Sequence, residues 1–335
     1  FSQRAFFNGR IDLTQAEAIM DLISAKTELA ARAAQEQLEG VLGKQIENLR
    51  EALVSATAHL EAYIDFPEED ITPDSADKLF ERFETIEASL KSLLSTADQG
   101  KILREGLKTV IVGAPNAGKS SLLNLFLGFD RAIVNEQAGT TRDTIEELIN
   151  LNGIPIRLID TAGIREGEGE IEKEGIRRSQ QELELAELVL LVIDSSESRD
   201  RVNEIEIPKS TRVVRILNKS DLPSHRDWKG DPGIRVSCLD ESAADSIREL
   251  LYREISANGP IESASLTAIN SRHQFCLGKA LQSMEKAKLG LEAGESAEFV
   301  AIDLRDALGS VGEVIGKTDI EEILGEIFST FCIGK

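Results

Sequence analysis

The chain has 335 residues, of which 38 are basic and 59 acidic, giving a formal net charge of −21. Since single domains usually contain about 100–200 residues, this length predicts two domains. The negative charge repels nucleic-acid phosphates and anionic membranes, which disfavours tight RNA binding by this chain alone. Three cysteines, Cys238, Cys276 and Cys332, are too few and too scattered for a disulfide framework or a zinc cluster, so we expect a cytoplasmic protein.

The apolar runs are too short for a membrane protein. The longest, Leu188–Ile193, falls far short of the ~20 residues that span a bilayer, so we expect a soluble protein. Because residue 1 is phenylalanine and not methionine, we expect the chain to be a piece of a longer protein.

The N-terminal part carries helical patterns. From Leu13 to about Ile64 the sequence is rich in alanine, glutamate, glutamine and leucine, and Thr14 followed by Glu17 predicts a capping box at the helix start. Proline and acidic residues in 65–70 predict its end. A second helix, continuing to about Arg104, is predicted by apolar residues at three-and-four spacing: Leu79, Phe83, Ile86, Leu90, Leu93 and Leu94.

The periodicity then changes to that of strands. Short apolar runs bounded by turn residues predict buried parallel strands at 109–112, 154–159, 188–193 and 213–217. Residues 145–151, joined to the next run by Asn152-Gly153, predict an antiparallel edge strand in a hairpin.

Helical patterns return after about Leu251. Near the end, a capping box of Thr318 and Glu321 precedes apolar residues on one helix face: Ile320, Ile323, Leu324, Ile327, Phe328 and Phe331. We therefore predict an α/β domain with a mostly parallel sheet (105–256), inserted into an all-α helical bundle built from 1–104 and 257–335.

A phosphate-binding loop lies between the first predicted strand and a helix. Residues 113–120 fit G-x-x-x-x-G-K-S, in which backbone N–H groups wrap phosphates, Lys119 reaches the β and γ oxygens and Ser120 ligates Mg²⁺. The alternative is a chance glycine-rich turn. The predicted nucleotide contacts in this loop are Asn116, Ala117, Gly118, Lys119, Ser120 and Ser121.

Two later motifs indicate the metal and the base. Asp160-Thr161-Ala162-Gly163 follows a strand, placing a carboxylate beside the metal and the Gly163 N–H near a γ-phosphate. In Asn218-Lys219-Ser220-Asp221, the aspartate can accept two hydrogen bonds from guanine, whereas adenine offers no such donor pair; an Asx turn is the alternative reading. Ser237 and Cys238, in the loop after Val236, are expected to complete the base site. Together the three motifs resemble the Ras-like P-loop GTPase fold and predict GTP as ligand.

The segment between the P-loop and Asp160 is expected to be a switch. In Gly139-Thr140-Thr141-Arg142-Asp143 we assign Thr141 to Mg²⁺, the alternative being a polar turn. GTPases commonly use a glutamine to hold the attacking water and an arginine finger to offset charge. Here Ile164 follows Gly163 and cannot orient water, so hydrolysis is either poor or uses another polar residue.

Several motifs resemble the TrmE/MnmE family of tRNA-modification GTPases over nearly the whole chain. They are Pro115-Asn116-Ala117 in the P-loop, Gly139–Asp143 in the switch, the opening stretch 4–18, and the terminal Phe331-Cys332-Ile333-Gly334-Lys335. This resemblance implies a K⁺ ion in place of an arginine finger, bound by Asn116, Asn135, Gln137 and Thr140. It also implies that Glu172 positions water and that Cys332 takes part in the modification reaction. From the sequence alone, Glu172 is one acid of a solvated loop and Cys332 a small buried residue.

The resemblance also implies partners. The family modifies the wobble uridine (U34) of tRNA together with a flavoprotein of the GidA/MnmG type, and its G domains self-associate. Family members carry an N-terminal folate-binding domain that helps them dimerise, so we expect this chain not to bind folate. Two other readings stay open: a ribosome-assembly GTPase switch of the Era/Der type, and a helical scaffold with an inactive GTP-binding domain.

Overall fold

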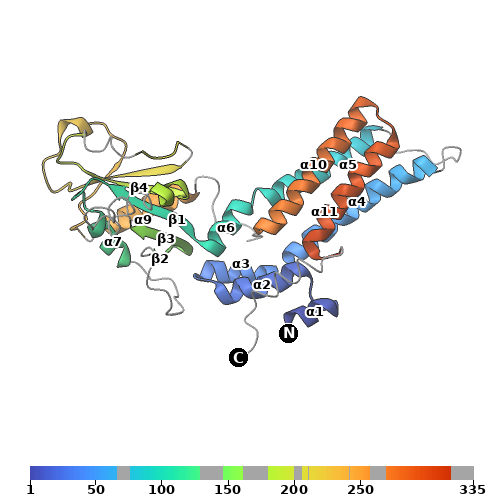
Figure 1. Cartoon of the computed structure of the whole chain (residues 1–335), viewed down its shortest axis with the longest axis horizontal. Helices are drawn as coiled ribbons and strands as arrows, with labels where there is room; N and C mark the ends of the chain where they lie inside the picture. Colours follow the sequence, from blue (N-terminus) through green and yellow to red (C-terminus); the bar gives the residue numbers. More distant parts are fainter. Residues whose placement is uncertain are drawn as a thin grey trace. The chain divides into compact units, whose positions relative to one another are not determined.

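The computed structural model of the chain describes residues 1–65, 76–128, 146–160, 180–199, 206–209, 211–240, 242–256 and 269–317. These residues form two compact units (Figure 1). The first comprises Phe1–Ala25, Ala30–Arg104 and the described part of Ser263–Lys335, and the second comprises Lys26–Leu29 and the described part of Glu105–Glu262. The two ends of the chain therefore share one unit, and the central segment forms the other.

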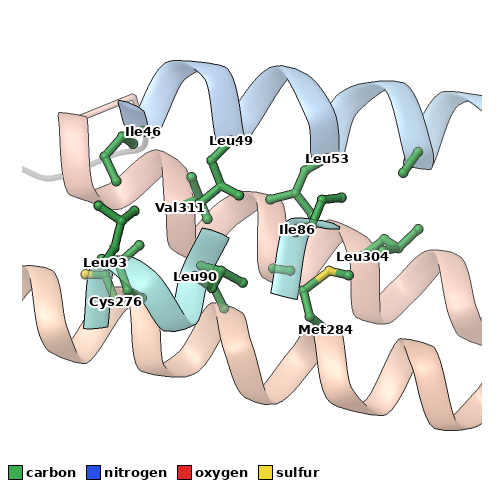
Figure 2. Close-up of a cluster of buried hydrophobic side chains, with 14 of the residues drawn as sticks. Ile46, Leu49, Leu53, Ile86, Leu90, Leu93, Cys276, Met284, Leu304 and Val311 are labelled. Atoms are coloured by element: carbon green, nitrogen blue, oxygen red, sulfur yellow. The ribbon is translucent and has the colours of Figure 1, made fainter. Parts of the chain in front are cut away.

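Helices from both ends of the chain build the first unit. They are α1 (Ser2–Phe7), α2 (Leu13–Ser24), α3 (Glu28–Leu38), α4 (Val41–Asp65), α5 (Ala76–Leu94), α6 (Ala97–Glu105), α10 (Ser271–Ala293) and α11 (Ala297–Ile315). Helix α10 packs along α11 and α5, while α11 also packs along α4. Leu53, Leu90, Met284 and Leu304, one from each of these four helices, belong to one buried core (Figure 2). The predicted helical bundle built from both ends is confirmed.

Helix α2 begins differently from the prediction. Asp12 is its N-cap: the Asp12 carboxylate accepts the Gln15 N–H at 2.8 Å, and the Gln15 side chain accepts the Asp12 N–H at 3.0 Å. The Thr14 hydroxyl donates to Asp12 at 2.7 Å, so it serves the cap and is not the cap itself. An aspartate is favoured here because its charge also interacts with the positive end of the helix dipole. The predicted capping box of Thr14 and Glu17 is therefore wrong.

Both long helices predicted for the N-terminal part are interrupted. The stretch from Leu13 to Ile64 divides into α2, α3 and α4, with Gly40 in a left-handed conformation (φ 84°) before α4. The side-chain amide of Gln15 donates to the Leu38 carbonyl at 2.8 Å, so a tertiary contact satisfies the end of α3. The second helix divides into α5 and α6 at Thr96, whose hydroxyl donates to the Leu93 carbonyl at 2.7 Å. Such side-chain bonds compete with the helical backbone.

The second unit is built on a sheet. Its strands are β1 (Leu107–Gly113), β2 (Glu146–Leu151), β3 (Ile154–Asp160), β4 (Leu188–Asp194), β5 (Arg212–Asn218) and β6 (Ile234–Arg235), and its helices include α7 (Lys119–Leu127) and α9 (Ser242–Ile255). The strand order is β2-β3-β1-β4-β5-β6, with β2 antiparallel to β3 and the other neighbours parallel. The predicted mostly parallel sheet with an antiparallel edge strand is confirmed. The two-residue strand β6 was not predicted, since it is too short to carry a pattern.

The strand order determines where a ligand can bind. The chain passes from β1 to β3 on one side of β1 and later to β4 on the other side, so β1 lies at a topological switch point (Figure 1). Because β1, β3, β4 and β5 are parallel, their carboxyl ends lie at one edge of the sheet. Ligands of open α/β sheets bind at this edge, next to the switch point. None of the helices in the described ranges is both long and apolar enough to cross a membrane.

Candidate nucleotide-binding site

The loop between β1 and α7 starts from a strand that is buried almost throughout. Gly113, the last residue of β1, lies opposite Val192 of β4, and a Cβ atom at Gly113 would come within 2.3 Å of the Val192 carbonyl oxygen. The first glycine of the P-loop pattern is therefore required by strand packing. Its position fixes where the loop leaves the sheet.

Two left-handed residues shape the loop itself. Asn116 has φ 62°, and Gly118, the N-cap residue of α7, has φ 102°. Successive backbone N–H groups around such residues form concavities that bind anions, and the free N–H groups at the start of α7 add the positive end of a helix dipole. The loop therefore has the geometry of a phosphate cradle.

The lysine of the P-loop lies inside this loop. Lys119 is only 9% exposed, and its ammonium donates to the carbonyls of Gly113 at 3.1 Å and Ala114 at 2.9 Å. Both acceptors are backbone atoms of the loop, so the charge is held at the centre of the loop by uncharged oxygens. An ammonium held by backbone carbonyls at this point suits the binding of a phosphate.

Asn218 joins this loop to the end of β5. Its amide nitrogen donates to the Ala117 carbonyl at 2.9 Å, and its amide oxygen accepts the Cys238 N–H at 3.0 Å. The side chain is 3% exposed, so both bonds are shielded from water. One buried amide thus connects the P-loop, β5 and the segment after Val236, which are far apart in the sequence.

The residues assigned to the base lie beside Asn218. Asp221 is exposed, and within the described part of the chain its carboxylate has no hydrogen-bond donor or cation as a partner. Ser237 and Cys238 are half-buried. Burial raises the pKa of the Cys238 thiol to about 11, so the thiol stays protonated at neutral pH and Cys238 contributes through its backbone N–H. An uncommitted carboxylate at this edge is suited to accept hydrogen bonds from a base.

Asp194 is a charged residue next to the predicted base site that was not predicted from the sequence. Asp194 ends β4 next to Asn218 in the sheet register, and its carboxylate accepts the Lys219 ammonium at 2.6 Å. Burial opposes ionisation of Asp194, but hydrogen bonds from Lys219 and Ser196 outweigh it and lower its pKa. The signal available was an aspartate directly after the apolar run Leu188–Ile193, as Asp160 follows Ile159.

Oxygen donors suited to Mg²⁺ occur at the same edge. Ser120 is exposed in the first turn of α7. Asp160 is the last residue of β3 and lies opposite Ile111 of β1 in the sheet register. Hydroxyl and carboxylate oxygens are ligands that Mg²⁺ prefers, so these residue types fit that ion. The exposed Asn116 likewise offers an amide oxygen for K⁺, and Ser121 on α7 is half-buried.

Several predicted site residues lie outside the described part of the chain. They are Asn135, Gln137, Thr140, Thr141, Gly163, Glu172 and Cys332. The structure places the P-loop, Asn218 and the segment after Val236 next to one another. The ligand assignments of all the site residues, including these seven, stay predictions. Within the described ranges, no three histidine, cysteine, aspartate or glutamate side chains are grouped so that they could hold a metal ion.

A family model and the curated relatives agree on one family. A family model described as MnmE helical domain matches residues 13–332. The tRNA modification GTPase MnmE of Akkermansia muciniphila is 51% identical and that of Natranaerobius thermophilus 43% identical; in both cases all of this chain aligns with 75% of the relative. Among solved structures, Aquifex aeolicus Era Y63A bound to GDP.AlF4⁻ is 28% identical over 53% of this chain and 66% of that chain, with a TM-score of 0.34.

Proposed function

The chain belongs to the MnmE family of tRNA modification GTPases, and from this premise we propose that it hydrolyses GTP at the edge of its sheet in a K⁺-dependent way. The observation that carries the proposal is the Asn218 amide, which holds the P-loop and the base-binding segment together at the carboxyl ends of β1 and β5. A nucleotide needs both parts at once, because its phosphates and its base bind at different points.

The phosphates would bind on the loop between β1 and α7. Lys119 already lies at the centre of this loop, where its ammonium donates to the Gly113 and Ala114 carbonyls, which a phosphate oxygen can replace as acceptors. Ser120 and Thr141 would hold Mg²⁺, which neutralises phosphate charge when bound. Asp221 would accept the two donors of the guanine edge, which adenine lacks. Lys119, Ser120 and Asp221 thus each have a role that follows from the chemistry of the side chain.

Hydrolysis would use residues other than a glutamine. Ile164 occupies the position after Gly163 and has no group that orients water. Glu172 would hold the attacking water. Asn116, Asn135, Gln137 and Thr140 would hold K⁺, which supplies positive charge against the transition state where other GTPases use an arginine finger.

The biological reaction we propose is modification of the wobble uridine (U34) of tRNA. A net charge of −21 supports an arrangement in which a GidA/MnmG-type flavoprotein holds most of the RNA. Cys332 would serve the modification reaction, and pairing of two G domains would accompany the GTP cycle. Both proteins would work in the cytoplasm.

The first test compares GTP hydrolysis in KCl and NaCl at matched ionic strength. We expect K⁺ to accelerate hydrolysis at least about tenfold, a small part of what an arginine finger supplies. The stimulation should disappear in Asn116→Gly, which deletes the amide but accepts φ 62° without strain. Asn152→Gly, the same change at φ 51° in the β2–β3 turn, is the matched control and should keep the stimulation.

Equal rates of the wild type in the two salts would contradict the K⁺ mechanism. Loss of the K⁺ effect in Asn152→Gly as well would show that Asn116 is not its cause. Binding of GDP by each variant, measured with a fluorescent nucleotide, separates loss of catalysis from loss of the site.

A further inference from the structure

The ends of β4 and β5 carry an ion pair beside the base site. Asp194 and Asn218 are opposite each other in the register of these parallel strands, and Lys219 follows directly. The Lys219 ammonium lies 2.6 Å from the Asp194 carboxylate. The Asp194 side chain is 9% exposed and that of Lys219 32%, so the pair lies partly out of water and holds its geometry better than a fully exposed one.

The second oxygen of Asp194 is also committed. It accepts the Ser196 backbone N–H at 3.0 Å and the Ser196 hydroxyl at 2.6 Å. A carboxylate bound on both oxygens cannot rotate freely. Lys219 is therefore tied to a fixed point of the sheet and not to another mobile side chain.

The backbone around Lys219 is equally constrained. Lys219 has a left-handed φ of 60°, Asn218 is anchored through its amide, and the Ser220 N–H donates to the Val236 carbonyl at 3.1 Å. With both neighbours fixed, only the long side chain of Lys219 could still change its conformation. The ion pair with Asp194 restrains it.

We propose that Asp194 is a positioning residue for guanine recognition and that it acts through Lys219. Held at its tip, the hydrocarbon chain of Lys219 forms a fixed apolar surface next to the site of the base. The same contact keeps the ammonium from Asp221, the next carboxylate along the chain, whose oxygens stay available to the guanine edge. The role rests on the proposed binding of GTP by this site.

The size of the effect follows from the conformational entropy that an unpaired lysine loses when a ligand orders it. This loss weakens binding, and the ion pair with Asp194 orders Lys219 before the nucleotide binds. Asp194→Asn keeps the shape of the side chain and an oxygen for Ser196 but removes the charge that holds Lys219. We expect the KM for GTP and the Kd for fluorescent GDP to rise about fivefold. The kcat should stay within about twofold, because Asp194 does not touch the reacting phosphate.

A double-mutant cycle on the full chain tests whether Asp194 acts through Lys219. Lys219→Met keeps most of the hydrocarbon and removes the ammonium, so the double variant should bind GDP no more weakly than Lys219→Met alone. Ser196→Ala is the matched control: its backbone N–H still donates to Asp194 and Lys219 keeps its partner, so GDP affinity should stay within about twofold of wild type.

Three results would overturn the role of Asp194. The first is unchanged GDP affinity in Asp194→Asn. The second is a double variant in which the fold-losses of GDP affinity in Asp194→Asn and Lys219→Met multiply. The third is an equal loss of GDP affinity in Ser196→Ala, which would assign the effect to the turn after β4. A wild-type chain that fails to bind GDP would instead refute the proposed function. Normal GDP binding by both wild type and Asp194→Asn would refute only the inference about Asp194.

Discussion

Replacing Gly118 by alanine tests the coupling between the P-loop and Asn218. Gly118 has φ 102° and ψ 25°, a conformation that residues with a Cβ atom rarely adopt. An added Cβ would lie 2.1 Å from the amide nitrogen of Asn218. That side chain is buried and bonded at both ends, to Ala117 and to Cys238, so it cannot move away without losing a hydrogen bond.

The structure sets the size of the expected effect. A left-handed backbone costs a residue other than glycine about 1–2 kcal/mol. A buried polar group that loses its hydrogen-bond partner costs about 1–3 kcal/mol. Together these two costs predict that Gly118→Ala lowers the free energy of unfolding of the second unit, here called the sheet unit, by about 2–5 kcal/mol. The affinity for GDP should also fall, because the loop is displaced.

Urea unfolding monitored by tryptophan fluorescence measures this effect. The chain has a single tryptophan, Trp228, which is fully buried in the sheet unit and reports on its unfolding. Gly128→Ala is the matched control at the other end of α7, where φ is −76° and ψ is −13°, a conformation that alanine adopts without strain. The added Cβ would lie 3.2 Å from the Leu125 carbonyl oxygen, which has to shift by a few tenths of an ångström, against 2.1 Å from Asn218 at Gly118. Its unfolding free energy should stay within about 0.5 kcal/mol of wild type.

Combining Gly118→Ala with Asn218→Ala decides whether the clash is the cause. The double variant removes the side chain that the new Cβ would strike, so its cost should be smaller than the sum of the two single costs. Additive costs, or a Gly118→Ala protein with the urea midpoint of wild type, would refute the reasoning.

Two further predictions concern the helical unit. Burial alone would raise the pKa of Glu17, but its contacts with His273 (2.7 Å) and Arg272 (2.7 Å) outweigh burial and lower the pKa from the ordinary 4.5 to about 2. Because the folded pKa is depressed, this stabilisation is complete above about pH 5 and is lost as the pH falls to about 2. Burial lowers the pKa of His273, so at pH 7 its imidazole is neutral and Arg272 is the charged partner of Glu17. Glu17→Gln leaves the Arg272 guanidinium without this carboxylate and should cost about 3 kcal/mol at pH 7. It should also reduce the acid sensitivity of unfolding; circular dichroism melts with the same acid sensitivity as wild type would contradict this. Gly278 lies inside α10, where an added Cβ would meet no atom within 4 Å, so Gly278→Ala should raise stability by about 0.5–1 kcal/mol, and a lower melting temperature would show that the site needs glycine.

Much of the fold follows from local patterns in the sequence. Apolar runs bounded by turn residues identified β1, β3, β4 and β5, and Asn152-Gly153 identified the hairpin, where both residues have positive φ. These features depend on backbone conformation and on side-chain alternation, which neighbouring residues determine. The spacing of the P-loop motif is local in the same sense, so Lys119 and its loop could be assigned without a structure.

Where helices begin and end was decided by contacts between distant residues. Gly40 and the Gln15 amide separate α3 from α4, although the sequence there reads as continuous helix. A helical pattern records which face is apolar, but it does not record which carbonyl a side chain from another helix will reach. The start of α2 is different, because the capping box of Asp12 and Gln15 joins residues only three apart in the chain and was present in the sequence.

Only the tertiary structure determined how the site is held together. Asn218 meets Ala117 because β5 lies two strands from β1, and Asp194 meets Lys219 because β4 and β5 are paired in register. Such partners depend on strand order, a property of the whole sheet that no local spacing specifies. The sequence by itself determined which chemical groups are available for GTP; the packing of the parallel strands determined which of them meet, since it places residues from distant parts of the chain at one edge.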